Sequence, residues 1–309
     1  MKAELVLDQK CVLGEGPWWD GSAGVLWWID GLEEHGKGNR LFRYDPKTGI
    51  NQSVAIRKHL GCAIPATDGR ILLALQDGIW LFDWEKKLFS DLCDLEREIT
   101  NNRINDGKVD SKGRLWVGSM SMTANQDVEF ETTGSFYRFT IDDGVVKQFG
   151  GVGISNGIAW NADETQMYYI DSTAHVVFAF DFDSKRGTLS NRRTAVSIDP
   201  AEGIPDGMTI DAEDMIWVAH FGGGKVSRFN PVTQERLAEI LLPCENVTSC
   251  CFGGEALDTL YITTASIGLS PVQRPTQPSP VDYLLQNQAC AADSYFALKL
   301  SKTEPGQRR

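Results

Sequence analysis

A short apolar segment recurs along the chain, and each copy follows a polar turn. These segments, rich in Trp, Tyr, Leu and Ile, begin at Leu26, Ile71, Leu115, Met167, Ile216 and Leu260. The intervals between them are 45, 44, 52, 49 and 44 residues. A further apolar strand is expected after each of them, over residues 40–44, 78–82, 134–139, 176–180, 225–229 and 294–298. Short strands separated by turns at a regular spacing predict an all-β repeat protein.

The spacing of these repeats is typical of the blades of a β-propeller. Helical repeats would show a 3.6-residue periodicity, and the chain shows almost none. We therefore predict an all-β fold, a six-bladed β-propeller, formed as one domain over residues 1–309. Residues 4–7 are expected to complete the last blade and close the ring. Two β-sandwiches in tandem are the alternative organisation.

The turn in each repeat provides a common register for the innermost strand. Counting back five residues from Asp20, Asp68, Asp110, Asn161, Asp211 and Gly254 reaches Glu15, Ala63, Asn105, Asn156, Asp206 and Ser249. We expect these positions to be equivalent around the central channel, near one rim. A glycine directly follows Glu15, Asn156 and Asp206. Glycine permits a close backbone approach or an unusual dihedral angle at such a place.

Four polar residues in this register predict a metal site. Two carboxylates that converge on one axis repel each other unless a cation or protons intervene. Oxygen ligands suit hard divalent ions such as Ca²⁺, Mg²⁺ or Mn²⁺, and Zn²⁺ or Fe²⁺ is also compatible. We therefore predict one divalent metal ion on Glu15, Asn156 and Asp206. The alternative is that these Asx-Gly and Glu-Gly pairs are ordinary turn formers.

The composition narrows the classes of partner. With 30 Lys and Arg against 42 Asp and Glu, the formal net charge is −12. Such a chain is not expected to bind nucleic acid or an anionic membrane through bulk electrostatics. The sequence contains no run of 18 apolar residues, so no membrane span is expected. The N-terminus lacks the apolar core of a signal peptide. Seven cysteines without a CxxC pair fit a reduced, cytoplasmic setting; the oligomeric state stays open.

Five segments carry a family resemblance, over residues 13–17, 103–110, 154–157, 203–208 and 248–254. In this order they resemble the senescence marker protein, gluconolactonase and luciferin-regenerating enzyme family of regucalcin-like sugar lactonases. The resemblance covers residues 13 to about 265. It implies a six-bladed propeller that hydrolyses sugar lactones, with a metal on Glu15, Asn156 and Asp206. It further implies substrate contacts by Arg103 and Asn105, and an acid/base role for Asp206.

Two segments depart from the family pattern. Residues 119–125 read Ser-Met-Ser-Met-Thr-Ala-Asn, where some animal members carry acidic residues, so the sugar preference does not transfer. A Pro-rich insertion precedes an atypical segment at residues 290–294, which makes the edge of the last blade harder to assign. The long segments 119–134 and 271–289 are expected either to cover the site as a lid or rim, or to be plain excursions.

The candidate site residues also have simpler alternatives. Arg103 offers donors to lactone or hydroxyl oxygens, or forms a surface ion pair. Asn105 binds a sugar hydroxyl or a metal-bound water, or caps a turn. If the strand contains a bulge, Asp106 would replace Asn105 at the channel. We favour Asn105.

The predicted function is divalent-metal-dependent hydrolysis of aldonolactones, a small-molecule substrate, to sugar acids. A lactonase or esterase acting on a non-sugar substrate is one alternative. A non-catalytic propeller that binds calcium or a protein is another, because a propeller fold does not determine function. Converging carboxylates discriminate between these classes, since a pure scaffold does not need them.

Overall fold

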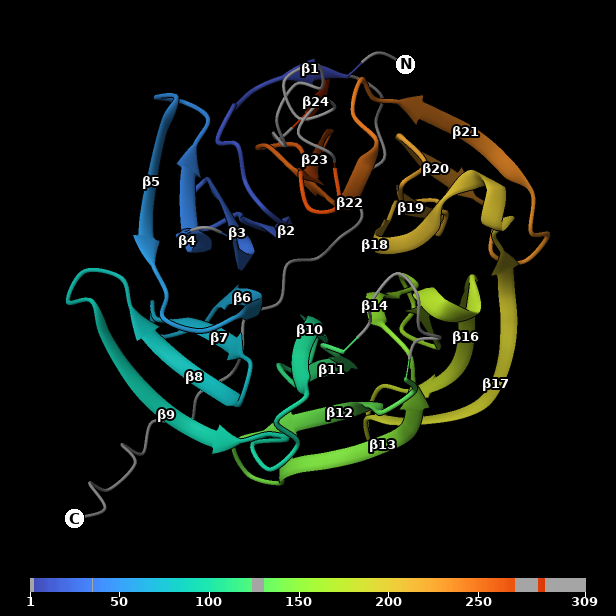
Figure 1. The fold of residues 1–309 in the computed structure, drawn as a ribbon. Helices are drawn as coiled ribbons and strands as arrows, with labels where there is room; N and C mark the ends of the chain where they lie inside the picture. Colours follow the sequence, from blue (N-terminus) through green and yellow to red (C-terminus); the bar gives the residue numbers. More distant parts are fainter. Residues whose placement is uncertain (1–2, 35, 124–130, 270–282, 287–309) are drawn as a thin grey trace.

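A computed structural model describes residues 3–34, 36–123, 131–269 and, for the backbone, 283–286. Within these ranges the strands form six four-stranded antiparallel sheets, which stand around a central channel with their first strands innermost (Figure 1). The first sheet comprises β2 (Gly14–Asp20), β3 (Val25–Glu34), β4 (Lys37–Asp45) and β5 (Ile50–Ala55). The second comprises β6 (Leu60–Pro65), β7 (Ile71–Leu75), β8 (Gly78–Asp83) and β9 (Leu88–Asp94).

The next three sheets repeat this order. The third comprises β10 (Asn102–Val109), β11 (Leu115–Ser121), β12 (Gly134–Thr140) and β13 (Gly144–Val152). The fourth comprises β14 (Ser155–Trp160), β15 (Gln166–Asp171), β16 (Val176–Asp183) and β17 (Thr188–Ser197). The fifth comprises β18 (Ile204–Ile210), β19 (Ile216–Phe221), β20 (Lys225–Phe229) and β21 (Arg236–Leu241). Two short 3₁₀ turns precede strands on one rim, η1 (Ser172–Ala174) and η2 (Pro200–Glu202).

The last sheet corrects the prediction of six equivalent blades. Five sheets each use four consecutive strands, whereas this one combines β22 (Asn246–Gly253), β23 (Thr259–Ala265) and β24 (Tyr283–Gln286) with β1 (Glu4–Leu5) from the start of the chain. Its outer pairing is short, with Glu4 opposite Leu284 and Leu5 opposite Tyr283. The all-β propeller is therefore confirmed as five continuous blades and one composite sheet.

The closure of the ring was predicted in part. Residues 4 and 5 do add a strand to the last sheet, as expected. The third strand of that sheet is β24, at residues 283–286, rather than residues 294–298. Residues 294–298 lie outside the described part of the chain, as do 124–130 and most of the 271–289 segment.

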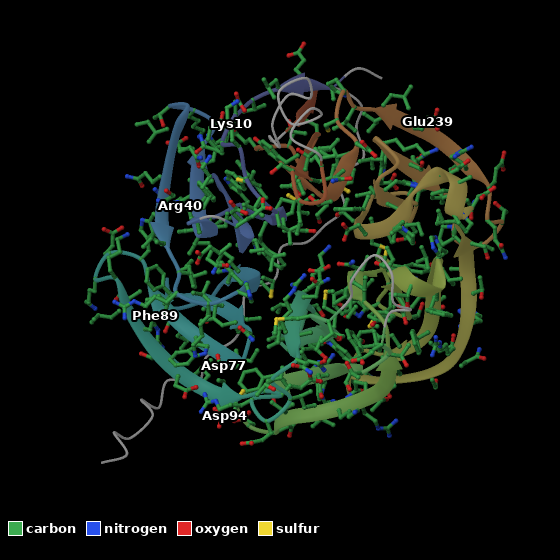
Figure 2. The ribbon with its side chains drawn as sticks, in the orientation of Figure 1. Lys10, Arg40, Asp77, Phe89, Asp94 and Glu239 are labelled. Atoms are coloured by element: carbon green, nitrogen blue, oxygen red, sulfur yellow. The ribbon has the colours of Figure 1, made fainter. Side chains whose placement is uncertain are left out.

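Buried apolar side chains occur in the second strand of every sheet and in the third strand of the first five sheets, and the clusters that they form extend between neighbouring sheets. β7 is buried along its whole length. Aromatic rings stack across strands, as between Trp28 and Phe42, whose ring centroids lie 3.9 Å apart. The outermost strands are much more exposed, and Figure 2 shows Phe89 and Asp94 of β9 at the periphery. The buried inner wall therefore gives the channel rigid sides.

In the third to sixth sheets, the residue from which the register was counted accepts a backbone hydrogen bond from the amide three residues later, but in the second sheet a different residue does so. There the turn begins at Ala66, because the Gly69 amide donates to the Ala66 carbonyl at 3.1 Å. Counting back five residues from Ala66 reaches Gly61. Gly61, not Ala63, is therefore equivalent to the polar positions of the other sheets.

No helix within the described ranges is long and apolar enough to cross a lipid bilayer.

Candidate active site

Each of the six inner strands, as described, contains a β-bulge near the common register. The register shifts fall at Glu15/Trp18, Leu60/Cys62, Ile104/Asp106, Asn156/Ile158, Pro205/Met208 and Val247/Ser249. A bulge re-aims side chains that a regular strand would alternate between its two faces. The polar residues near the start of the inner strands therefore converge at one end of the channel.

The structure brings the five predicted site residues into one group. The Asn105 side-chain nitrogen donates to Asn156 Oδ1 at 2.8 Å, across two sheets. The charge of Glu15 acts on Asp206, and the charges of both carboxylates act on Arg103. Asn156, Asp206 and Arg103 are buried, and Glu15 and Asn105 are partly exposed.

The two carboxylates of this group have raised pKa values, because their surroundings disfavour the charged form. Burial raises the pKa of Glu15 to about 8, and the neighbouring charge of Asp106 adds to the effect. Burial also raises the pKa of Asp206 well above its usual range, with further contributions from Glu15 and Asp106. Arg103 and backbone amides lower these pKa values only in part. When both carboxylates are ionised they repel each other, and a positive charge between them would offset this repulsion.

Asp106 is a third carboxylate at the channel. The bulge lies between Ile104 and Asp106, so that Asn105 is the extra residue in β10. Asn105 contacts Asn156, while Asp106 lines the channel and accepts a hydrogen bond from the Gly107 amide at 2.7 Å. Burial raises the pKa of Asp106 to about 6. Asn105 and Asp106 were treated as alternatives from the sequence, but both reach the site.

Arg103 provides the positive charge of the group. It is 7% exposed, and its Nη1 donates a hydrogen bond to the Ile104 carbonyl at 3.3 Å. Burial lowers its pKa to about 10, while Glu15 and Asp206 act in the opposite direction. A surface ion pair, the alternative considered from the sequence, does not describe this buried side chain.

His59 lies beside Arg103 at the start of β6, a position that the sequence pattern did not indicate. Gly61, two residues later, packs so closely on β10 that an added Cβ would lie 2.8 Å from the carbonyl oxygens of Ile104 and Asn105. Burial lowers the pKa of His59, and the charge of Arg103 lowers it further. Its Nδ1 is buried without a hydrogen-bond partner among the described residues. This leaves a neutral imidazole beside the site.

Glycine after the polar residue has two physical roles. Gly16 has φ +54°, in the left-handed region that side chains disfavour. At Gly157 an added Cβ would lie 2.9 Å from the Asp206 carbonyl oxygen. Both roles expected from the sequence are therefore present. The contact at Gly157 lets β14 and β18 approach, which brings Asn156 and Asp206 together.

Buried side chains on the second strands hold the backbone just before the site residues. Asp30 accepts hydrogen bonds from the amides of Val12 and Leu13, at 3.1 and 2.7 Å. In the fourth sheet Asp171 similarly accepts from the amides of Gly153 and Ile154, both at 3.3 Å. In the fifth sheet His220 Nδ1 lies 3.1 Å from the Glu202 carbonyl oxygen. Each therefore fixes the chain shortly before Glu15, Asn156 or Asp206.

These supporting residues were not predicted, although the sequence contains a sign of two of them. Asp30 ends the run Trp27-Trp28-Ile29-Asp30, and Asp171 ends Tyr168-Tyr169-Ile170-Asp171. The shared pattern of two aromatics, Ile and Asp marks one structural position in two sheets.

A small cavity lies in the channel next to the polar group. Its volume is about 40 Å³, which is enough for ordered water. Its walls come from the inner strands of all six sheets, and its lining includes Gly16, Ala63, Asp106, Ile158, Met208 and Ser249. Asp106 is therefore positioned to contact water as well as the other carboxylates.

The donor set fits a hard divalent cation. Glu15 and Asp206 supply carboxylate oxygens and two negative charges, and Asn156 supplies an amide oxygen with a second lone pair. Within the described residues, no three His, Cys, Asp or Glu side chains form a metal-binding group by themselves. The amide oxygen of Asn156 is thus the third donor of the predicted set.

Comparison with known proteins identifies the family. The sequence model of the SMP-30/gluconolactonase/LRE-like region matches residues 13–266. The chain belongs to this family. Within related proteins, it is 40% identical to regucalcin of Danio rerio over 278 residues, which cover 90% of this chain and 91% of that protein. It is 34% identical to YvrE of Bacillus subtilis, whose name refers to sugar lactone lactonase activity, over 90% of this chain and 92% of that protein.

Solved structures share the fold of this chain. A luciferin-regenerating enzyme superimposes with a TM-score of 0.88 at 30% identity, covering 96% of this chain and 99% of that one. A regucalcin from Agrobacterium tumefaciens also has a TM-score of 0.88, at 24% identity, covering 97% and 99%. The second likeness supports the fold alone.

Proposed function

We propose that this protein hydrolyses sugar lactones to sugar acids with one divalent metal ion on Glu15, Asn156 and Asp206. The observation that carries the proposal is the convergence of Glu15 and Asp206 beside Arg103 at the channel. Family membership supports the reaction class, because YvrE is named for sugar lactone lactonase activity. A divalent ion would polarise the lactone carbonyl and acidify a bound water.

The reaction needs a base and donors for the ester oxygens. A lactone is a cyclic ester, so water adds to its carbonyl carbon and the bond to the ring oxygen breaks. Asp206 is the candidate base that accepts the proton of the attacking water, and the proton then passes to the ring oxygen that leaves. Arg103 is the candidate donor to a lactone or hydroxyl oxygen. The product is an open-chain hydroxy acid.

Acid release from a panel of aldonolactones tests the proposal. We expect turnover that chelator abolishes and that added divalent metal restores. A parallel series of non-sugar lactones and simple esters defines the substrate class. Metal-dependent turnover of the non-sugar series alone would replace the sugar assignment. Absence of turnover on every lactone and ester would instead favour a binding propeller.

A further inference from the structure

Ser172 occupies the junction between two of the proposed metal ligands. It begins η1, and its side chain is almost fully buried. Its Oγ accepts a hydrogen bond from Asn156 Nδ2 at 2.8 Å and donates one to the Pro205 carbonyl at 2.6 Å. Pro205 directly precedes Asp206 in β18. One hydroxyl thus contacts the side chain of one ligand and the backbone beside another.

The backbone of Ser172 is itself held firmly. Its amide donates to the Ile154 carbonyl at 3.0 Å. Asp171 caps η1, because its side chain accepts from the Thr173 amide. The hydroxyl therefore projects from a fixed point rather than from a free loop.

The chemistry of the hydroxyl fixes the direction of its hydrogen bonds. A hydroxyl has one hydrogen, and the Pro205 carbonyl can only accept it. The Ser172 oxygen must then accept from Asn156, so the amide nitrogen of Asn156 faces Ser172. Asn156 Oδ1 consequently points the other way, where it accepts from Asn105. The orientation of the Asn156 amide is thereby set by Ser172.

The hydrogen bonds of Asn105 run in the same direction as those of Asn156 and Ser172. The side-chain nitrogen of Asn105 donates to Asn156 Oδ1 and to the Ser155 carbonyl, both at 2.8 Å. Both of its hydrogens are used in this way. Asn105 therefore keeps its Oδ1 as an acceptor for a ligand hydroxyl or water, while Arg103 is the donor of the pair.

We propose that Ser172 is a positioning residue that sets the direction of the chain Asn105, Asn156, Ser172, Pro205 and so holds the oxygen ligands in place for a metal ion. The inference rests on the proposed metal site. It goes beyond that site because it assigns the amide orientation to a residue outside the ligand set. Outer residues that orient ligands commonly change metal affinity by about 10- to 100-fold.

Direct metal titration tests the role of Ser172 without using activity. Purified metal-free protein is titrated calorimetrically with Mn²⁺ alone. We expect Ser172→Ala to bind about 10- to 100-fold more weakly than the unmodified protein. Ser227→Ala is the matched control, because the Ser227 hydroxyl is also buried but has no hydrogen-bond partner among the described residues. It should bind as tightly as the unmodified protein.

A second pair of variants, made in an Asn156→Asp background, distinguishes an effect of Ser172 on the orientation of the Asn156 amide from an effect on packing. Asn156→Asp replaces the amide with a carboxylate, whose two oxygens are chemically alike and need no orientation. In that background, Ser172→Ala should change Mn²⁺ affinity by less than about threefold, in the manner of a double-mutant cycle. An equal loss in both backgrounds would overturn the proposed role.

The outcomes distinguish this inference from the proposed function. If the unmodified protein binds no Mn²⁺, the metal site and the role of Ser172 are both wrong. If the unmodified protein and Ser172→Ala bind equally well, only the role of Ser172 is wrong. A selective loss in Ser172→Ala, absent from Ser227→Ala, supports the inference.

Discussion

Glu15 and Asp206 are neighbouring carboxylates with raised pKa values, and the charge of Glu15 contributes to the rise at Asp206. Without a cation, at least part of this pair holds protons or bears repulsion, because Arg103 supplies only one positive charge. Removing one of the two negative charges should therefore stabilise the metal-free protein, because the repulsion is lost. The same change should weaken metal binding, because a ligand is lost. Function and stability are expected to respond in opposite directions at these residues.

Asp206→Asn and Glu15→Gln should each lower kcat/KM by about 100-fold or more, because they remove a ligand and, at Asp206, the base. The melting temperature of the metal-free protein should stay equal or rise, since one repelling charge is gone. Lactone turnover and thermal unfolding measure the two effects. Glu235→Gln makes the same chemical change on the exposed surface and should alter neither.

Arg103→Ala should raise KM by about 10- to 100-fold, the equivalent of one or two charge-assisted hydrogen bonds. Metal affinity should be unchanged or tighter, because the site becomes more negative. Arg103→Lys keeps the charge without the planar fork and should lie between the two in KM. Parallel metal titration and substrate kinetics check this, and equal loss of metal in Arg103→Ala would refute the assigned role.

Sequence could predict the position of Glu15, Asn156 and Asp206 because a turn at a fixed distance marks each one. It could not predict Ser172, because nothing in its neighbours shows that its hydroxyl meets two other sheet segments. The sequence analysis favoured Asn105 over Asp106 at the channel for a related reason. Alternation along a strand places it opposite Asn105, and only the bulge directs both toward the channel.

At the level of elements, the inner strands approach each other because glycine leaves room for a neighbouring backbone. The contact between Gly157 and the Asp206 carbonyl is the clearest case. Outer strands behave differently. β9 is largely exposed, so it lacks the apolar pattern that revealed the buried strands. The sequence therefore predicted the second and third strands of the first five sheets, but not their edges.

Gly157→Ala should destabilise the protein by about 1–3 kcal/mol, because the new methyl group would push β14 from β18. Metal affinity should fall as well, since Asn156 and Asp206 lie on these two strands. Urea unfolding and metal titration measure the two effects. Gly21→Ala is the control, as an added Cβ there meets only ordinary contacts at 3.8 Å or more. Equal stability of both variants would contradict the packing argument.

At the scale of the whole molecule, His220 should contribute a pH dependence to stability. It is fully buried, and burial and the charge of Lys225 lower its pKa from 6.5 to about 4. Arg236 acts in the same direction, and Glu202 opposes both. Between these pH values the unfolded chain binds a proton that the folded chain does not. This contribution is therefore complete above pH 6.5 and is lost as the pH falls toward 4.

The expected slope is at most about 1.4 kcal/mol per pH unit within that window. His220→Asn keeps a donor toward the Glu202 carbonyl but cannot titrate. Its unfolding free energy, measured by denaturant between pH 4.5 and 7.5, should fall less steeply on acidification than that of the unmodified protein. Identical slopes would show that His220 does not contribute.

Five of the repeats expected from the sequence form continuous four-stranded blades, but the construction of the last sheet did not follow completely from the sequence. The third strand of that sheet was expected at residues 294–298, where the apolar pattern is stronger, yet residues 283–286 occupy the position. Apolar pattern alone does not determine which segment pairs, because pairing also depends on how far the chain must travel from β23.

The composite sheet has a consequence for how the protein is made. β1 is synthesised before the other strands of the propeller, while its partner β24 follows some 280 residues later. The five continuous blades can each form as their strands emerge. β1 therefore cannot take its place in the last sheet until β24 has been synthesised, and only then can the ring close.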